Sequence, residues 1–524
     1  MADREWDIIV VGAGSNGLVL AGELAARGAK VLALEARPEA GGLLTAEECS
    51  LPGYWHNLLG AVLNPLDRTP PYQALGLEQE GARFLVPPVQ VALPTRDQRA
   101  VVFADDAELS RRSIAAFSEL DGQTYRELRA DLLPIFQHDV IPQMYSPPSP
   151  MAGPIHPDLQ RYGPQSPRDI AEGFFESPPL QAAVLHQLLV PWGVLPDYRG
   201  HGSATLRALS GAAPFAVAAG SARRTAQALV RALVRQGGEY RVEQTVGRIL
   251  VEPGEGGAAG AWRAVGVALA DGTQLRARAV ASSGGLRQTL LDLVGQEALG
   301  PSLAAQVSAF RLDEYALFAV HLALAQPPHY PCEDTHTVGA AVDRALRVLI
   351  GVESPAEIDA LWREIRAGTL PEPRGMVVTV PTLFDPSQAP PDRHTAVLLQ
   401  PVPPAPGGSP ERWDALRDEY AARCVANWRR YATNLRDEDI LAAVALTPRD
   451  VAARYPNYAQ GALGMGAMTV DQAGPNRPLP ELSQYKTPID GLYLCGYAMH
   501  PGPGWLGAPG HNAAQVLAQD LGLS

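Results

Sequence analysis

Hydrophobic residues form two short continuous runs near the N-terminus, with a helical pattern between them. Asp7 to Val11 and Lys30 to Leu34 are apolar runs of strand length, while Leu18 to Arg27 carries helix formers with an apolar stripe. This order predicts a strand–helix–strand unit of the Rossmann type, in which ligands bind beside the turn between the first strand and the helix.

Glycines occupy that turn with the spacing GxGxxG. Gly12 allows a tight turn, Gly14 lets a pyrophosphate approach the backbone, and Gly17 lets helix and strand pack closely. The helix start offers unpaired N–H groups and the positive end of a dipole, which favour an anion. Glu35, at the end of the second run, is placed to accept hydrogen bonds from a ribose. The neighbouring residues predicted to bind the same dinucleotide are Ser15, Asn16, Ala36 and Arg37.

The residues after Glu35 distinguish FAD from NAD. A second glycine pair, Gly41 and Gly42, matches an extended pattern in which the chain passes close to bound FAD. The N-terminus resembles flavoproteins that include phytoene desaturases and flavin amine oxidases. Phe174 to Leu206 resembles the FAD-dependent phytoene desaturase and carotenoid oxidoreductase superfamily, especially its pyridine nucleotide-disulfide oxidoreductase domain-containing protein 2 branch. The cofactor that this resemblance implies is FAD.

The C-terminal stretch Gly491 to Leu521 resembles the closing FAD segment of the same superfamily. A strand from Leu492 to Cys495 is expected to deliver Gly496 to the cofactor, and a helix is expected to begin near Ala508 to Gly510. The resemblance places the start of that helix at the flavin, where its dipole stabilises negative charge on the reduced ring. Further cofactor-binding residues implied by the resemblance are Gly504, Trp505, Leu506, Gly507 and, beside the adenine, Val246.

The expected fold class is α/β, a Rossmann-type FAD-binding domain of the glutathione reductase-like kind with an interleaved α+β substrate-binding domain. The FAD-binding domain is expected to take residues 1–77, 216–300 and 446–524, and the substrate domain residues 78–215 and 301–445. Tyr240 to Val251 alternates like a half-buried strand, and Ala264 to Leu269 pairs with Gln274 to Ala281 as a predicted hairpin.

One segment of the substrate domain, Ile141 to Pro157, has too many prolines for a helix or a central strand and predicts a loop. A plain surface connector is the favoured interpretation, and a mobile lid or an apolar entrance facing a membrane is the alternative. The run Ala316 to Leu324 predicts a buried strand with His321 inside it.

Composition narrows the function classes. The net charge of −13 and pI near 5.4 disfavour nucleic acid and a purely electrostatic hold on anionic membranes. The longest nearly apolar run is far shorter than the ~20 residues of a membrane span, and no secretory leader is expected. The cysteines are far apart, which favours a reducing, cytoplasmic setting and predicts no metal. Peripheral membrane contact and oligomeric state stay open.

Four residues are candidates for catalysis. His500 and Trp505 lie on the closing FAD turn, while His56 and Asn57 lie in Leu51 to Leu66, which resembles the family's loop toward the isoalloxazine ring. For each, packing or a structural hydrogen bond is the competing interpretation.

The resemblance implies dehydrogenation of a hydrophobic isoprenoid-like, carotenoid-like or cyclic molecule, with hydride transfer to flavin N5. Oxygen, a quinone or another acceptor would reoxidise the flavin. The alternatives are a redox-neutral isomerase, a flavin amine oxidase and a non-catalytic flavoprotein that binds a partner. Amine oxidases of this fold typically use a mid-chain lysine and a glutamate after the closing glycine. Here the lysines are Lys30 and Lys486, and Tyr497 follows Gly496, so an amine substrate is disfavoured.

Overall fold

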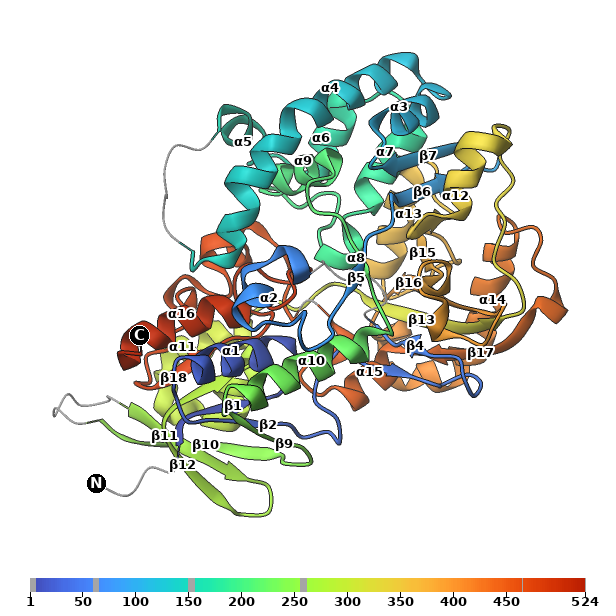
Figure 1. Ribbon diagram of the computed structural model, residues 1–524. Helices are drawn as coiled ribbons and strands as arrows, with labels where there is room; N and C mark the ends of the chain where they lie inside the picture. The colour runs from blue at the N-terminus through green and yellow to red at the C-terminus, as the bar shows by residue number, and fades with distance from the viewer. Residues whose placement is uncertain (1–5, 60–65, 149–155, 255–261, 464, 524) are drawn as a thin grey trace.

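The computed structural model describes residues 6–59, 66–148, 156–254, 262–463 and 465–523, and its strands form two large sheets (Figure 1). The first sheet consists of β10 (Val246–Pro253), β11 (Trp262–Leu269), β12 (Gln274–Ser282), β1 (Trp6–Val11), β2 (Val31–Leu34) and β9 (Glu239–Arg241) in this order, with β18 (Leu492–Leu494) also paired to β12. Strands β18, β12, β1, β2 and β9 run parallel, and β10 and β11 extend the sheet as an antiparallel pair.

Three helices cover one face of the parallel part. Helix α1 (Ser15–Ala26) follows β1 and packs against α10 (Ala222–Arg235) and α16 (Ala508–Leu521). Nearly every residue of α1 is buried, because it is surrounded by the sheet and by both neighbouring helices. The predicted Rossmann-type unit is therefore confirmed, and the helices from the two ends of the chain lie side by side (Figure 1).

The second sheet is mixed and forms the centre of the α+β part. Its strands are β17 (Ile440–Leu446), β13 (Ala316–Leu324), β16 (His394–Val402), β15 (Met376–Thr379), β14 (Arg347–Ile350), β6 (Val89–Pro94) and β7 (Ala100–Ala104) in this order. Successive residues of β13 point into different cores: Leu317 and Ala319 into one, and Phe318 and Val320 into the other. A strand buried on both faces has no polar side, which explains its unbroken apolar run.

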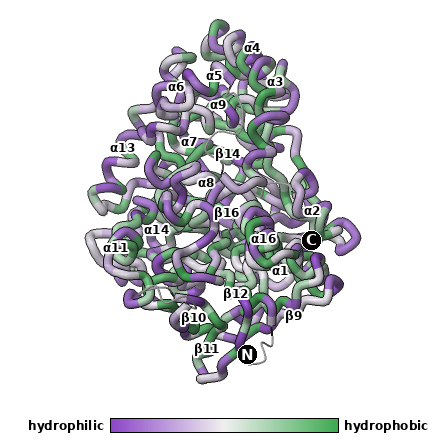
Figure 2. The backbone as a smooth tube through the Cα atoms, turned by 90° about the vertical axis from the view of Figure 1, so that its left-hand side faces the viewer, coloured by the Kyte–Doolittle hydropathy of each residue, from purple (hydrophilic) through white to green (hydrophobic). Residues whose placement is uncertain are grey.

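Helices cover both faces of this sheet. One core includes residues of α4 (Glu119–Ile135), α6 (Pro167–Phe174), α7 (Pro178–His186), α9 (Gly202–Ser210) and α13 (Pro355–Arg366). The other includes α14 (Trp413–Arg429). In Figure 2 the helices α4, α5 (Pro157–Tyr162), α6 and α9 lie at one end of the molecule and strands β9 to β12 at the other.

Each sheet is assembled from segments that are far apart in the sequence. The first takes strands from 6–34, 239–282 and 492–494, and the second from 89–104 and 316–446. The expected interleaving of the two domains agrees with this arrangement. The domain boundaries at 77, 215, 300 and 445 stay predictions.

One detail of the strand prediction was wrong. Tyr240 to Val251 is two strands, β9 and β10, because β9 pairs with β2 whereas β10 pairs with β11. Between them Glu243 adopts a left-handed φ of 55°, which ends the first strand. Helix α1 begins at Ser15, directly after the glycine turn, and includes most of the predicted helical stripe.

The proline-rich segment also departs from its prediction. Ile141–Tyr145 forms a short 3₁₀ helix, and residues 149–155 lie outside the described residues. Tyr145 is buried, and the carbonyls of Met144 and Tyr145 accept hydrogen bonds from Asn512 and Gln515 of α16. A plain surface connector is therefore wrong for Ile141–Tyr145, which docks on the C-terminal helix.

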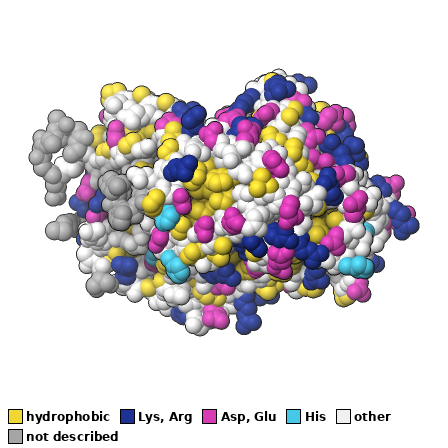
Figure 3. All heavy atoms as spheres, turned by 90° about the horizontal axis from the view of Figure 1, so that it is seen from above, with side chains coloured by type: hydrophobic (Ala, Val, Ile, Leu, Met, Phe, Trp, Pro, Cys, Tyr) yellow, Lys and Arg dark blue, Asp and Glu magenta, His cyan; other side chains and the backbone are white. Residues whose placement is uncertain are grey.

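The surface charges and the lengths of the helices both bear on contact with membranes. On the face shown in Figure 3, acidic and basic side chains are intermixed. Across the described ranges, none of the helices is both long enough and apolar enough to cross a bilayer.

The close approach of α1 and α16 gives a stability prediction. A Cβ on Gly510 would lie 2.1 Å from the Asn16 carbonyl oxygen, so Gly510→Ala must push the helices apart. We expect it to lower the free energy of unfolding by roughly 1–3 kcal/mol, measured by urea denaturation. The control is Gly173→Ala in α6, where an added Cβ meets nothing within 4 Å and should leave stability unchanged or raised. Equal effects of the two substitutions would contradict the packing argument.

Candidate cofactor site and active site

The site is built where three parallel strands end. Ser283, directly after β12, donates from its backbone N–H to the Val11 carbonyl (2.9 Å) and from Oγ to the Gly12 carbonyl (2.9 Å). A Cβ on Gly496, which follows β18 closely, would lie 2.6 Å from the Ser283 carbonyl oxygen. The ends of β1, β12 and β18 are thus held together around one serine.

The glycine turn after β1 has the geometry that its spacing predicts. Gly12 has a φ of 91°, and a Cβ on Gly17 would lie 2.1 Å from the Gly12 carbonyl oxygen. Gly14 faces the second glycine pair, because a Cβ on Gly42 would lie 3.1 Å from the Gly14 Cα. Gly41 donates to the Ala13 carbonyl (2.7 Å). Side chains at these positions would close the space that a ligand's phosphates need.

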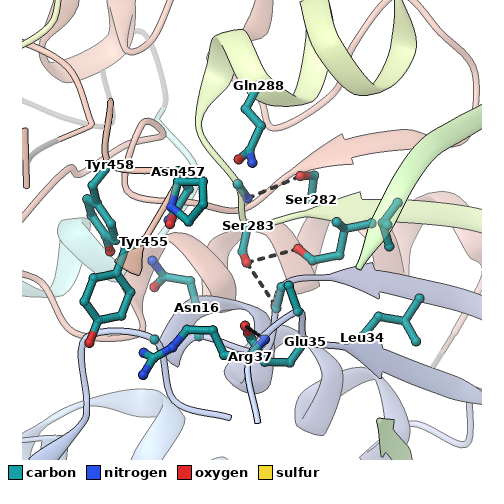
Figure 4. Close-up of a pocket in the computed structure, with 18 of the residues that line it drawn as sticks. Asn16, Leu34, Glu35, Arg37, Ser282, Ser283, Gln288, Tyr455, Asn457 and Tyr458 are labelled. Atoms are coloured by element: carbon teal, nitrogen blue, oxygen red, sulfur yellow. Dashed lines mark hydrogen bonds between the residues drawn. The ribbon is translucent and has the colours of Figure 1, made fainter. Parts of the chain in front are cut away.

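A cavity of about 300 Å³ opens beside this turn (Figure 4). The predicted cofactor residues that line it are Gly12, Gly14, Ser15, Asn16, Glu35, Ala36, Arg37, Gly42 and Val246. Gly17 and Gly41 instead pack just behind the turn. No side chain caps the first turn of α1, so its N–H groups and dipole are available to an anion.

The polar groups around the cavity are only partly satisfied. The Glu35 carboxylate accepts from the backbone N–H groups of Ala13 and Arg37, both at 3.0 Å, which fixes it at the end of β2. Asn16 Oδ1 and Arg37 Nη1 are buried and have no hydrogen-bond partner within the described ranges. Buried polar atoms without partners are costly, so they indicate a ligand that completes their bonds.

Several cavity residues were missed in the sequence. They are Gln244, Thr245, Ser282, Ser283, Gly284, Gln288, Arg454, Tyr455, Asn457, Tyr458 and Tyr497. The motif Ser283-Gly284-Gly285 directly after a strand was a usable signal, because it repeats the strand-then-glycine order of the first turn. Residues 454–458 carried no such signal: they reach the cavity only because α15 (Pro448–Arg454) ends there.

The C-terminal segment adjoins the same region. Gly507 has a left-handed φ of 76° and begins α16, and Gly504 has a φ of 80°. Gly504, Trp505, Leu506 and Gly507 are not among the residues that line the described cavity. Trp505 is buried, with its ring centroid 6.2 Å from that of Tyr145. Cofactor contact by these four residues and by Gly496 stays a prediction.

One of the catalytic candidates, Asn57, lies in a buried polar network. Asn57 donates from Nδ2 to Gln388 Oε1 (2.8 Å) and accepts from the Ala222 N–H (2.7 Å) at the start of α10. Gln388 also donates to Asp385, and Asp385 accepts from the Gly220 N–H (2.6 Å). Asn57 therefore joins β4 (His56–Asn57), α10 and the second domain, and a catalytic role for it stays a prediction.

His56 lies in a different cluster. The centroid of its ring is 5.4 Å from that of His321. Cys49 lies beside both histidines: one metal-ligating atom from each of the three residues lies within 4.8 Å of the other two. Burial lowers the pKa of His56 to about 4 and that of His321 to about 3, and it raises the pKa of Cys49 to about 11. All three are neutral at pH 7, and the expectation of no metal stays a prediction.

His500 is buried near the start of α16. Burial lowers its pKa to about 4, so its imidazole is neutral at pH 7. Its carbonyl accepts from the Tyr485 hydroxyl (2.8 Å), which fixes the backbone at this turn. A neutral imidazole can accept a proton, and catalysis by His500 or Trp505 stays a prediction.

Comparison with known proteins places the chain in a family. Residues 10–75 match the model described as NAD(P)-binding Rossmann-like domain. The chain is 31% identical over 99% of its length to a subunit of limonene dehydrogenase from Castellaniella defragrans, covering 96% of that protein. It is 27% identical, over 99% of its length and 94% of the relative's, to pyridine nucleotide-disulfide oxidoreductase domain-containing protein 2 of Mus musculus. The chain belongs to the phytoene desaturase superfamily of FAD-dependent oxidoreductases.

A solved structure agrees on the fold. An oxidoreductase from Methanosarcina mazei aligns with a TM-score of 0.61 over 98% of this chain and all of that chain, at 16% identity. FAD is the cofactor of this family, and the residues present fit it. The glycine turn leaves room for phosphates, Glu35 is fixed at the cavity wall where a ribose is expected, and Asn16 and Arg37 have unused polar atoms.

The position of Glu35 gives a binding prediction. We expect Glu35→Ala to weaken FAD retention roughly 10- to 100-fold, because a charge-assisted hydrogen bond is lost and the turn loses two bonds. The control is Glu39→Ala, since Glu39 is exposed and pairs with Arg223. The measurement is FAD titration by flavin fluorescence, and unchanged retention would remove Glu35 from the site.

Buried neutral histidines predict acid sensitivity. The unfolded chain binds protons at histidine near pH 6.5, whereas folded His500 does so only near pH 4. The unfolded state therefore gains protons first, and stability is lost as pH falls from about 6.5 to 4. We expect His500→Gln to reduce this loss by roughly 1–3 kcal/mol in urea denaturation, and substitution of the exposed His138 to leave it unchanged. An identical pH dependence in His500→Gln and wild type would contradict the lowered pKa.

Proposed function

We propose that the chain dehydrogenates a hydrophobic small molecule, of isoprenoid-like, carotenoid-like or cyclic structure. The observation that carries the proposal is the 31% identity over nearly the whole chain to a protein named as a dehydrogenase of limonene. Other relatives are named as desaturases of phytoene. These names share dehydrogenation of an apolar carbon skeleton.

The positions of the lysines favour this reaction over amine oxidation. Lys30 is exposed and lies over the Trp6 ring at 4.8 Å, and Lys486 is exposed and pairs with Asp520 (2.7 Å). Neither lines the cavity beside the glycine turn. An amine oxidation that depends on a lysine beside the flavin therefore has no lysine available at this cavity. Removal of a hydride from a C–H bond does not require a lysine.

The chain's own residues supply binding and proton handling. The glycine turn, α1 and Glu35 would hold FAD, which accepts a hydride when bound. His500 is the candidate proton acceptor, because its buried imidazole is neutral at pH 7. The buried surroundings of Trp505 and Tyr145 would keep water from an apolar substrate.

A redox-neutral isomerase is a second candidate, because other relatives are named as prolycopene isomerases. For the dehydrogenase, oxygen, a quinone or another molecule would be the electron acceptor. We also propose a cytoplasmic location, which agrees with four cysteines that are all free. A non-catalytic role in binding a partner remains a third candidate.

Anaerobic stopped-flow mixing separates these candidates. We expect isoprenoid and cyclic alkene precursors to bleach the flavin, and primary, secondary and polyamines to leave it oxidised. Product without bleaching or an acceptor would favour isomerisation. Rapid reduction by an amine, with none by the apolar panel, would falsify the proposal. Neither bleaching nor product with any compound would favour the partner-binding role.

A further inference from the structure

A second, smaller cavity lies inside the substrate domain, away from the glycine turn. Its volume is about 40 Å³, and its walls include Gln187, Trp192, Arg207, Phe215 and Arg347. Trp192 ends α8 (Leu189–Trp192), Arg207 belongs to α9 and Arg347 begins β14. A water needs at least ~10–15 Å³, so this space holds a group of a few heavy atoms.

Four residues that line this cavity each carry a hydrogen-bond donor without a partner in the described ranges. These donors are Gln187 Nε2, Trp192 Nε1, Arg207 Nη1 and Arg347 Nε, and all are buried. The four residues are 3%, 4%, 6% and 4% exposed. Buried polar atoms are normally paired, so four unpaired donors around one cavity indicate a missing acceptor.

Neither arginine has a compensating acid. Within the described ranges, no carboxylate forms an ion pair with Arg207 or Arg347, and Asp105, which also lines the cavity, is exposed. Burial lowers the pKa of Arg207 to about 9 and that of Arg347 to about 10, so both remain charged at pH 7. An isolated buried charge is costly unless an opposite charge accompanies it.

Aromatic rings fix both guanidinium groups. The guanidinium carbon of Arg207 lies 4.2 Å from the Trp192 ring centroid and 4.7 Å from that of Trp505. That of Arg347 lies 4.7 Å from the Phe215 ring, while its Nη1 donates to the Val190 carbonyl (2.8 Å). Stacking leaves the planar edges of the guanidinium groups for an anion, as in bidentate recognition of a carboxylate.

We propose that this cavity binds the carboxylate group of a small organic acid. A carboxylate is planar, carries one negative charge and accepts up to about four hydrogen bonds, which matches two arginine edges, an indole N–H and an amide N–H. Its size also suits the cavity. Trp505 lies on the closing FAD segment and contacts Arg207, so the acid group would sit one side chain from that segment.

The carboxylate has two sources: the substrate itself or a separate small acid. If it belongs to the substrate, the inference rests on the proposed function and narrows the substrate class to apolar carboxylic acids. Binding is therefore measured independently of turnover. Acetate, octanoate and geranic acid are the acids, and octanol is the neutral control.

We expect octanoate to raise the melting temperature of the FAD-loaded protein and octanol at equal concentration to leave it unchanged. Arg207→Met and Arg347→Met should each weaken octanoate binding at least ten-fold by calorimetry, whereas Arg311→Met, at an exposed arginine paired with Asp471, should not. Without acid, Arg207→Met should melt no lower than wild type, because it removes a buried charge that has no ion-pair partner in the described ranges. Equal shifts with octanol, or unchanged affinity in both variants, would overturn the proposal.

A crystal structure of the wild-type protein with octanoate gives a test that needs no variant. Carboxylate density between Arg207 and Arg347 supports the proposal, and ordered water alone overturns it. Flavin reduction separates the sources: reduction by geranic acid that slows in Arg207→Met assigns the carboxylate to the substrate. Acid binding without reduction assigns it to a separate ligand. Absence of reduction by every compound tested would count against the proposed function while leaving the binding result intact.

Discussion

The close approach of three strand ends at Ser283 is the constraint on which the cofactor site depends. Ser283 bonds to the carbonyls of Val11 and Gly12, and Gly496 passes so near that a side chain would strike the Ser283 carbonyl. These segments come from the beginning, middle and end of the chain. The space beside the glycine turn is therefore enclosed only when β1, β12 and β18 have all joined the sheet. Glu35 and the uncapped start of α1 are positioned by the same strands.

Much of the cofactor site could be predicted from the sequence, because a phosphate turn depends on local backbone freedom. Gly12, Gly14 and Gly17 and the acid at Glu35 are recognisable from spacing alone. The structure gives the glycines the expected tight turn and places Glu35 beside it. The strands with continuous apolar runs, such as β13, could equally be predicted from the sequence. These features are encoded within a few consecutive residues, so no knowledge of distant contacts was needed.

The rest depends on contacts between residues far apart in sequence. The segment at Ile141–Tyr145 looked like a surface connector because its prolines report only local backbone preference, whereas its burial comes from Trp505 and α16. The break between β9 and β10 arises because each finds a different partner strand. Arg207 and Arg347 could not be identified from the sequence, because an arginine is ordinarily exposed. The cavity that they share forms only when α9 and β14 come together in the fold.

The polar network around Asn57 bears on how distant stretches of the chain are held together. Asn57, Gln388 and Asp385 tie β4, the start of α10 and the second domain together through buried hydrogen bonds. A separation of the two domains would break several of these hydrogen bonds at once, and the buried donors and acceptors would be left without partners. These buried bonds consequently oppose any separation of β4 and α10 from the Asp385–Gln388 segment. Loss of any one of these side chains would therefore leave buried donors and acceptors unpaired in two separate stretches of the chain at once.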